Sequence, residues 1–299
     1  MSNKASFFSR IKQSGLALPF AKGVSLALNK LAPNWAYRKV EDSFLKPNSK
    51  IIDKNSIPHG IGLFKINTRN GILQGYQLGN GPAVLLVHGW SGGAHQFFPL
   101  MNGLSRCGFT AITFDHFGHG HSEGQHASLP DFISAVNAAL QHINKNTHDG
   151  LAAIVGHSMG CIAIANAQPA LIKDIPLLLI SPVFNFKKYF TRQVNFHSLH
   201  SRLSQQYLSK FERSYLTDLD RMELTLKLGN YSGDSVIVHD KEDQQSDILD
   251  SINFCSANPL TKLVTTKGYG HSRLINSEIV WQQLKSHLNY EDITANRFN

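Results

Sequence analysis

The sequence predicts an α/β fold built on a mostly parallel central sheet, and three observations support this prediction. Short, continuously apolar runs, among them Ala83–Val87 and Leu151–Val155, are typical of strands that are covered on both faces. Patterns of helical periodicity alternate with these runs, as the strand–helix–strand units of a parallel sheet require. Glycine-rich loops with polar residues follow several of the strands, and an open parallel sheet carries its chemistry at the carboxyl ends of its strands.

The composition bounds the size and the partners of the protein. A chain of 299 residues with 42% hydrophobic and 17% charged residues is long enough for one large α/β domain with an insertion. Seven of the net +8 charges lie in residues 1–40, which contain no acid, so the remaining chain carries only +1. A nucleic-acid surface needs Lys and Arg clustered on one folded face, and we expect no nucleic-acid partner. The three widely spaced cysteines favour a reducing compartment over a disulfide framework or a zinc motif.

Residues 1–57 are predicted to form a basic N-terminal helical segment. Apolar residues recur at helical spacing from Phe20 to Leu31, and Pro33 ends this amphipathic pattern. No apolar run approaches the roughly 18 residues of a membrane span, and no cleavage site follows a clean apolar core. We therefore expect a cytoplasmic protein whose N-terminal helix packs on the catalytic body. The alternative is peripheral contact of this helix with an anionic membrane surface.

Residues 58–182 and 232–290 form the predicted core. The first two expected strands, on either side of Asn70-Gly71, should pair antiparallel. The expected strands are Leu63–Thr68, Ile72–Leu78, Ala83–Val87, Phe109–Phe114, Leu151–Val155, Pro176–Ile180, Ser235–Val238 and Leu260–Thr265. The main expected helices are Phe97–Cys107, one that begins at Pro130 with Phe132, Val136, Leu140 and Ile143 on its core face, one after Ser158, and Asn276–Leu288.

The chain is organised around Gly156-His157-Ser158-Met159-Gly160, which follows an apolar run and opens a run of small residues. This pattern predicts a strand, a sharp turn and a helix. Glycines on either side of the serine remove Cβ atoms that would collide at such a turn. The turn exposes the serine Oγ, and backbone N–H groups at the start of the helix can stabilise negative charge on a reacting carbonyl oxygen.

Four further loops follow predicted strands, at His88–Gly93, Asp115–Gly124, His239–Asp243 and Lys267–His271. Together with the serine turn they resemble, in order, five motifs of the α/β-hydrolase superfamily. These motifs are the oxyanion loop, the D-x-x-G-x-G-x-S-x-G segment, the G-x-S-x-G nucleophile elbow, the H-[GD]-x-x-D acid loop and the G-x-G-H histidine loop. The resemblance covers about residues 60–288 and implies a sheet with helices on both faces.

The resemblance also implies roles for five residues. Ser158 is the expected nucleophile, Asp243 the expected acid and His271 the expected base of a catalytic triad. The backbone N–H groups of Trp90 and Met159 are expected to form the oxyanion hole. A serine at the elbow excludes the branches of the superfamily that use an aspartate nucleophile.

Other polar residues near these motifs have alternative interpretations. Asp240 and Asp247 are the other candidates for the catalytic acid. The alternative interpretation is that Asp240 closes a loop and that Asp247 begins a helix. The polar run Gln244-Gln245-Ser246 departs from the apolar residues usual after the acid. His88 is expected to hold its loop by hydrogen bonds. The four histidines between His116 and His126 lack the spacing of a metal site, and we expect no metal.

Residues 183–231 interrupt the alternation of strands and helices. They contain many aromatic residues but no comparable strand, so they form an insertion, which the resemblance identifies as a small helical cap. The aromatic residues either line an acyl pocket or pack the cap against the body, and the sequence leaves both interpretations open. Residues 291–299 are a weakly specified tail.

These features together predict a serine esterase that cleaves carboxylic esters of small to medium acyl chains through an acyl-enzyme intermediate. We expect a small-molecule ester substrate and no cofactor. An acyltransferase or a thioesterase with the same triad is one alternative, and a non-enzymatic ligand-binding protein on the same scaffold is another. The sequence leaves the oligomeric state open.

Overall fold

The computed structural model describes residues 45–189, 191, 208–213 and 218–288. The chain divides into two compact units: one comprises Lys46–Phe184 and Met222–Asn299, and the other comprises Met1–Leu45 and Asn185–Arg221. The predicted N-terminal amphipathic helix and the predicted tail lie outside the described residues. The domain boundaries given above therefore stay predictions.

The larger unit contains an eight-stranded sheet with the strand order β1-β2-β4-β3-β5-β6-β7-β8. Its strands are β1 Gly62–Thr68, β2 Gly71–Leu78, β3 Ala83–Val87, β4 Thr110–Phe114, β5 Leu151–His157, β6 Leu177–Ile180, β7 Ser235–Asp240 and β8 Thr261–Thr266. Strand β2 pairs antiparallel with β1 and with β4, and all other pairs are parallel. Each strand corresponds to one that the sequence predicts, and the predicted mostly parallel sheet is confirmed.

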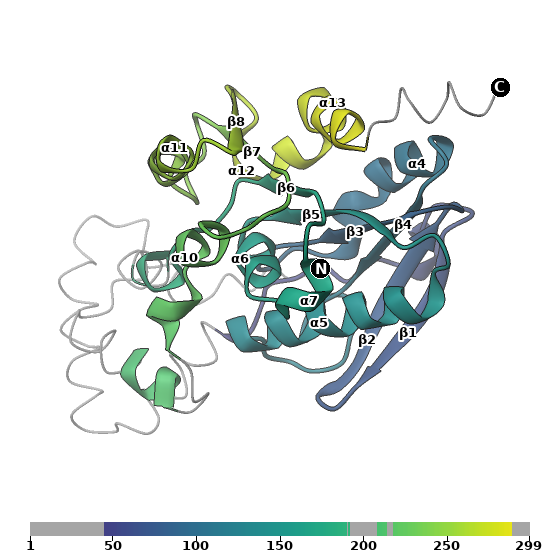
Figure 1. The fold of residues 1–299 in the computed structure, drawn as a ribbon. Coiled ribbons are helices and arrows are strands. Elements are labelled where there is room, and N and C mark those ends of the chain that lie inside the picture. The colour runs from purple at the N-terminus through teal and green to yellow at the C-terminus, as the bar shows by residue number, and fades with distance from the viewer. Residues whose placement is uncertain (1–44, 190, 192–207, 214–217, 289–299) are drawn as a thin grey trace, which may run out of the picture. The chain divides into compact units, whose positions relative to one another are not determined.

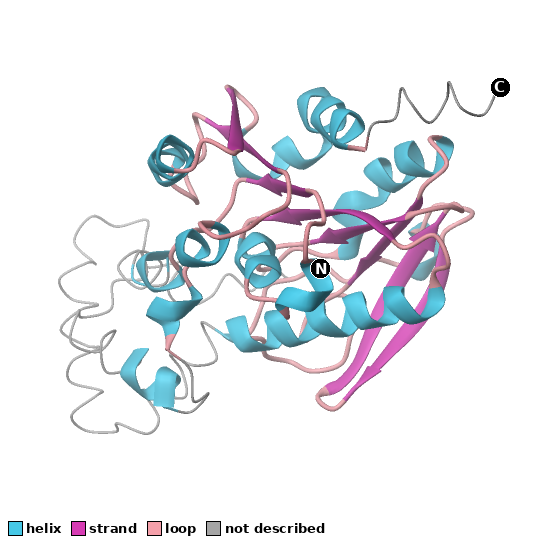
Figure 2. Cartoon of the chain, in the orientation of Figure 1, coloured by secondary structure: helices cyan, strands magenta, loops and turns pink. Residues whose placement is uncertain are grey.

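Helices cover both faces of this sheet. The helices of the larger unit are α4 Phe98–Arg106, α5 Leu129–Asn146, α6 Met159–Ala165, α7 Pro169–Ile172, α10 Leu224–Leu228, α11 Ile248–Ala257, α12 Gly270–Arg273 and α13 Glu278–His287, with 3₁₀ turns η1 Lys54–Ser56, η2 Ala94–Phe97 and η4 Leu274–Asn276. A further turn, η3 Leu219–Met222, lies where the two units meet in the sequence. Helices α4 and α13 lie on one face, and α5 and α6 lie on the other (Figures 1 and 2).

The local sequence explains where α5 begins and which face it buries. Ser128 is its N-cap, and the Ser128 N–H donates to Asp131 Oδ2 at 2.9 Å in a capping box. The helix therefore begins one residue before Pro130, which occupies its second position. The predicted core face, formed by Phe132, Val136, Leu140 and Ile143, is fully buried. Burial of such side chains stabilises the fold by about 1.5–3 kcal/mol each.

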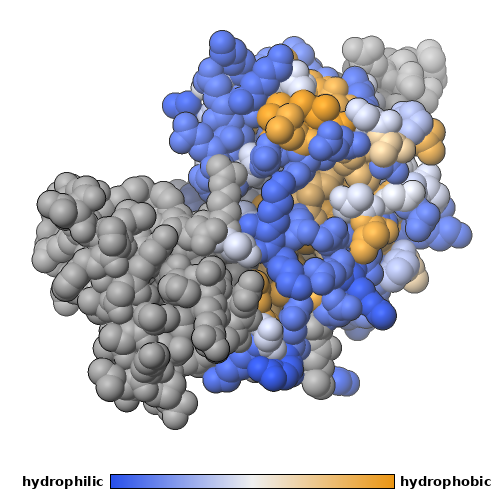
Figure 3. All heavy atoms as spheres, turned by 90° about the vertical axis from the view of Figure 1, so that its left-hand side faces the viewer, coloured by the Kyte–Doolittle hydropathy of each residue, from blue (hydrophilic) through white to orange (hydrophobic). Residues whose placement is uncertain are grey.

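Helix α11 is amphipathic, and its two faces have different neighbours. Leu249 and Ile252 are 58% and 38% exposed, whereas Ser251 and Phe254 are buried. Figure 3 looks onto the side of the molecule that carries α11 and shows apolar atoms gathered near the top of that side. The inner face of α11 carries Ser251 toward the end of β7.

In the described part of the chain, no helix is both long enough and apolar enough to cross a bilayer.

Candidate active site

Ser158 lies at the junction between β5 and α6, where the parallel strands present their carboxyl ends. Its backbone φ of 54° falls in the left-handed region, which non-glycine residues rarely adopt. Three main-chain hydrogen bonds hold this conformation: Ser158 N–H donates to Ile180 O at 3.0 Å, and Ser158 O accepts from Cys161 N–H at 3.1 Å and from Val183 N–H at 3.3 Å. The predicted strand–turn–helix is therefore present, with the strain that is typical of a nucleophile elbow.

Two glycines allow the loop after β3 to approach this turn closely. A Cβ atom on Gly89 would lie 2.7 Å from Ser158 Cβ, and one on Gly160 would lie 2.6 Å from Val87 O. Both separations are shorter than real Cβ contacts, so any larger residue would push the loop and the turn apart. The loop that begins with His88 consequently lies directly against Ser158.

His271 and Asp243 lie on neighbouring loops and are hydrogen-bonded to each other. His271, on α12, donates from Nδ1 to Asp243 Oδ2 at 2.7 Å. The other carboxylate oxygen, Oδ1, accepts from the backbone N–H groups of Gln245 at 2.8 Å and Ser246 at 3.1 Å. Ser246 Oγ donates to Oδ2 at 2.9 Å. The run after Asp243 thus supplies three hydrogen bonds to its carboxylate, two from backbone N–H groups and one from the Ser246 hydroxyl, which an apolar side chain could not provide.

The surroundings of Asp243 favour its ionised form. Burial alone would raise the pKa of this carboxyl, but the hydrogen bonds from His239, His271 and the backbone lower its pKa well below the usual range. A carboxylate at this position accepts the Nδ1 proton of His271 and so fixes the tautomer of the imidazole. The Nε2 atom of His271 is left without a proton and can act as a base.

His271 lies beside the turn that carries Ser158. The ring of His157, the residue before Ser158, contacts the ring of His271 with 4.7 Å between centroids, and His157 Nε2 donates to His271 O at 3.1 Å. Within the described chain, Ser158 Oγ makes no hydrogen bond, to His271 or to another residue. The structure thus joins Asp243 to His271 directly and places Ser158 next to them without a direct bond, as is common before substrate binds.

Two distant segments hold the loop after β3 by hydrogen bonds. Asn48 N–H donates to Ser91 Oγ at 3.0 Å, and Ser49 Oγ donates to Gly92 O at 2.6 Å. Ser91 N–H donates to His119 Nε2 at 3.1 Å. Ser91 itself has a φ of 56°. Sequence analysis missed Asn48 and Ser49, because they are 43 residues from the loop and carry no motif.

The two backbone groups predicted to form an oxyanion hole follow Gly89 and Ser158. The N–H groups of Trp90 and Met159 donate no hydrogen bond to any described residue. Met159 begins α6, so its N–H has no acceptor inside the helix. These two groups can therefore donate to a negatively charged oxygen.

The two alternative acids have other partners. Asp240 accepts from Thr266 Oγ1 at 2.7 Å, from Tyr269 N–H at 3.1 Å and from Glu242 N–H at 2.9 Å, which ties β7 to β8 and closes the loop between them. Asp247 is the N-cap of α11 and accepts from Leu249 N–H at 3.0 Å. Neither side chain is hydrogen-bonded to His271. Of the three candidate acids, the structure brings only Asp243 to the histidine.

The histidines around the glycine loop form hydrogen bonds with the main chain. His88 Nδ1 donates to Gly89 O at 2.8 Å, and its Nε2 accepts from His116 N–H at 3.1 Å, which fits the expected loop-holding role. His119 donates to Phe117 O at 2.8 Å. Burial lowers the pKa of His88 to about 4 and the pKa of His119 to about 3. These rings are therefore neutral at physiological pH.

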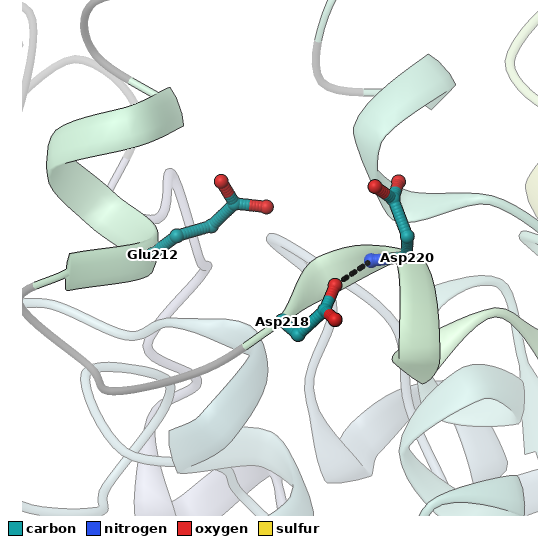
Figure 4. A group of neighbouring side chains, drawn as sticks. All are labelled: Glu212, Asp218 and Asp220. Carbon is teal, nitrogen blue, oxygen red and sulfur yellow. Dashed lines mark hydrogen bonds between the residues drawn. The ribbon is translucent and has the colours of Figure 1, made fainter.

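A group of carboxylates with metal-like spacing lies in the smaller unit. Among the described residues, only Glu212, Asp218 and Asp220 place three such ligand atoms together, and Asp218 accepts from the backbone N–H of Asp220 (Figure 4). Lys187 Nζ lies 2.9 Å from Asp220 Oδ2 and 3.5 Å from Glu212 Oε1. An ammonium group already neutralises part of this cluster, and we assign it no metal.

Comparisons with known proteins show what the chain is similar to. The family model described as "Serine aminopeptidase, S33" (Hydrolase_4) matches residues 81–271. A monoglyceride lipase homolog of monkeypox virus is 32% identical over 108 residues, which are 34% of this chain and 38% of that protein. The monoglyceride lipase of Rattus norvegicus is 33% identical over 104 residues, which are 33% of this chain and 34% of the lipase. The chain therefore spans between 34 and 38% of the length of these relatives.

A solved structure extends the comparison over most of the chain. An esterase of Pyrococcus furiosus superposes with a TM-score of 0.60 at 18% sequence identity, over 82% of this chain and 97% of the esterase. At this identity the likeness supports the fold alone.

Proposed function

The chain belongs to the serine aminopeptidase S33 (Hydrolase_4) family of α/β-hydrolases, and we propose that it is a serine hydrolase that cleaves carboxylic esters of small to medium acyl chains. The observation that carries the proposal is the 2.7 Å hydrogen bond between Asp243 and His271 beside the strained turn of Ser158. A serine, a histidine with a fixed tautomer and a buried carboxylate are the three parts that acyl transfer needs.

In the first half of the reaction, Ser158 Oγ attacks the carbonyl carbon of the ester. His271 Nε2 takes the serine proton, and the Asp243 carboxylate stabilises the imidazolium through the Nδ1 hydrogen bond. The carbonyl oxygen becomes an oxyanion, which accepts from the N–H groups of Trp90 and Met159. His271 then gives its proton to the alkoxide, so the alcohol leaves and the acyl group stays on Ser158.

In the second half, water replaces the alcohol. His271 takes a proton from a water molecule as the water oxygen attacks the acyl carbon. The same two N–H groups stabilise the second oxyanion. Return of the proton to Ser158 Oγ releases the carboxylic acid and restores the free serine, so the sum of the two halves is ester plus water to acid plus alcohol.

The relatives support esters as the substrate class. Two of them are named for action on monoglycerides, which are esters of a fatty acid and glycerol. The matched region is a third of each relative, so a monoglyceride is one ester to be tested and not the presumed substrate. The proposed reaction is the cleavage of an ester bond, with small or medium acyl chains as substrates.

Hydrolysis of a chain-length series of p-nitrophenyl esters, with a monoacylglycerol alongside, tests the proposal. We expect measurable turnover by the intact protein and a loss of roughly four or more orders of magnitude in Ser158→Ala. The acyl chain length that is cleaved fastest indicates the length of the acyl pocket. If the folded protein turns over no oxygen ester but cleaves thioesters or transfers acyl groups to an added alcohol, ester hydrolysis is the wrong reaction and the triad serves another acyl transfer.

A further inference from the structure

A second histidine contacts the proposed catalytic acid. His239 lies near the end of β7 and is fully buried. Its Nε2 atom lies 3.3 Å from Asp243 Oδ2, the same oxygen that accepts from His271, and 3.3 Å from Ser246 Oγ. Its Nδ1 atom lies 2.7 Å from Ser251 Oγ, on the inner face of α11. The two imidazoles thus approach one carboxylate oxygen, and a buried hydroxyl supports the second imidazole.

The direction of these hydrogen bonds follows from the groups involved. The Asp243 carboxylate can only accept, so the proton on the His239 ring must be on Nε2. The unprotonated Nδ1 then accepts from the hydroxyl of Ser251, which is a donor when its proton turns toward the ring. A neutral imidazole satisfies both contacts: the Asp243 carboxylate determines that Nε2 carries the proton, and the Ser251 hydroxyl donates to Nδ1. The resulting chain runs from Ser251 through His239 and Asp243 to His271.

We propose that His239 is a positioning residue for the catalytic acid, a proposal that rests on the function proposed above. His239 extends from a buried strand, whereas Gln245 and Ser246, which also donate to Asp243, lie on the loop that carries the acid itself. The bond from His239 therefore fixes Oδ2 relative to the sheet and not only relative to its own loop. It holds the oxygen in line with His271 Nδ1 while the imidazole gains and loses its proton.

A sequence pattern accompanies this role, but the pattern alone does not reveal the contact between His239 and Asp243. A histidine four residues before the acid is the first residue of the H-[GD]-x-x-D pattern at His239–Asp243. The strand continues to Asp240, and the chain then turns so that residue 243 comes back beside residue 239. Asp243 N–H donates to Asp240 O at 3.1 Å and closes that turn.

Two substitutions of His239 distinguish the contribution of its N–H donor from that of the volume of its side chain. His239→Met keeps a buried side chain of similar length but removes the N–H donor, whereas His239→Gln keeps an N–H near the position of Nε2. Ser235→Ala is the matched control, because Ser235 is also buried on β7 and loses a 2.8 Å hydrogen bond, to Thr261, at the opposite end of the strand. Thermal unfolding of each variant reports whether the fold is kept.

The rate of Ser158 phosphonylation by a fluorophosphonate probe is the readout, because it measures the activated serine without a choice of ester. We expect His239→Met to react about 10- to 100-fold more slowly than the intact protein, the factor for one hydrogen bond to a charged group. His239→Gln should recover most of that loss, and Ser235→Ala should react at the rate of the intact protein. In ester hydrolysis, we expect His239→Met to lower kcat and to leave KM nearly unchanged.

The same substitution in an Asp243→Asn background distinguishes positioning from a general disturbance. If His239 acts through the acid, His239→Met should cost little more once the carboxylate is gone. An equal loss in both backgrounds, or a full rate in folded His239→Met, overturns the inference. If His239→Met does not fold, Ser251→Ala takes its place in the cycle: a slower rate supports the inference, and a full rate overturns it. Failure of the intact protein to react with the probe contradicts the proposed function instead.

Discussion

Two histidine-rich regions lie at the carboxyl ends of the strands, and their imidazoles have different partners. In the acid region, the rings of His239 and His271 both reach the carboxylate of Asp243, at 3.3 and 2.7 Å. In the cluster formed by His88, His116 and His119, the rings contact one another and the main chain, and no ring makes a hydrogen bond to a described carboxylate.

The difference shows that the partner of a buried histidine, and not its frequency in the sequence, decides its role. A carboxylate stabilises the protonated ring, so the acid region can accept a proton during the reaction. In the histidine cluster no ring is hydrogen-bonded to a described carboxylate, and burial lowers the pKa of the rings. The cluster is therefore a neutral support for the loop after β3, where His119 accepts from Ser91 N–H. The predictions below test this contrast.

The largest effect is expected in the acid region. His271→Ala removes the proposed base, and ester turnover should fall roughly 10⁴- to 10⁶-fold, as removal of the base of a triad does. Steady-state hydrolysis of a p-nitrophenyl ester measures the loss. Unfolding of the variant by urea is the control for a lost fold. A variant that keeps more than a tenth of the activity would show that another group takes the proton.

The cluster should make the protein sensitive to acid. The pKa of His88 is lowered to about 4 and the pKa of His119 to about 3, so both rings are neutral in the native state at pH 5. In the unfolded chain a histidine has a pKa of about 6.5 and binds a proton below it. The unfolded state therefore binds more protons, and stability should fall as the pH drops from 7 to 5, by roughly several kcal/mol in total. Urea unfolding at both pH values measures it, and equal midpoints would contradict the neutral cluster.

A smaller effect is expected from His119, which lies on the loop after β4 and accepts from Ser91 N–H on the loop after β3. His119→Phe leaves Ser91 N–H without its acceptor, so the loop should shift and ester turnover should fall about tenfold, the equivalent of one hydrogen bond. His142→Phe is a suitable control, since His142 on α5 stacks on Phe64 of β1 with 4.6 Å between ring centroids and makes no hydrogen bond or ring contact with the described loop after β3. If the two variants have the same activity, His119 does not position the loop.

The smallest effect is expected from His116. Its ring stacks on Phe132 with 3.7 Å between centroids, and neither ring nitrogen makes a hydrogen bond with a described residue. His116→Phe keeps the shape and removes two unpaired polar atoms, so the free energy of unfolding should stay the same or rise by about 1 kcal/mol. Thermal and urea unfolding measure it. A clear loss of stability would mean that the imidazole binds a group that a phenyl ring cannot.

Much of the fold could be predicted because its signals are local. Continuous apolarity between Ala83 and Val87 predicts a buried strand from one stretch of sequence, and the G-x-S-x-G turn needs only five residues. The strand order could not be predicted in the same way. Strand β4 inserts between β2 and β3, and an apolar run does not say which neighbour it pairs with.

Those site residues could be predicted that have a suitable chemical type and also stand in a known motif. Asp243 and His271 follow strand ends in recognisable patterns, and the structure brings them together; their catalytic roles stay predictions. The contacts of His239 and Ser49 could not be predicted, because each depends on how distant segments meet. The polar run after Asp243 appeared to weaken its assignment, yet Gln245 and Ser246 supply hydrogen bonds to its carboxylate.

The most direct test of the account compares two aspartates three residues apart. Asp243→Asn keeps the shape of the side chain but removes the charge that fixes the tautomer of His271, whereas Asp240→Asn changes a side chain that ties β7 to β8. We predict that kcat/KM for a p-nitrophenyl ester falls about 10⁴-fold in Asp243→Asn and less than about tenfold in Asp240→Asn. Equal losses, or a larger loss in Asp240→Asn, would contradict the assignment of Asp243 as the catalytic acid.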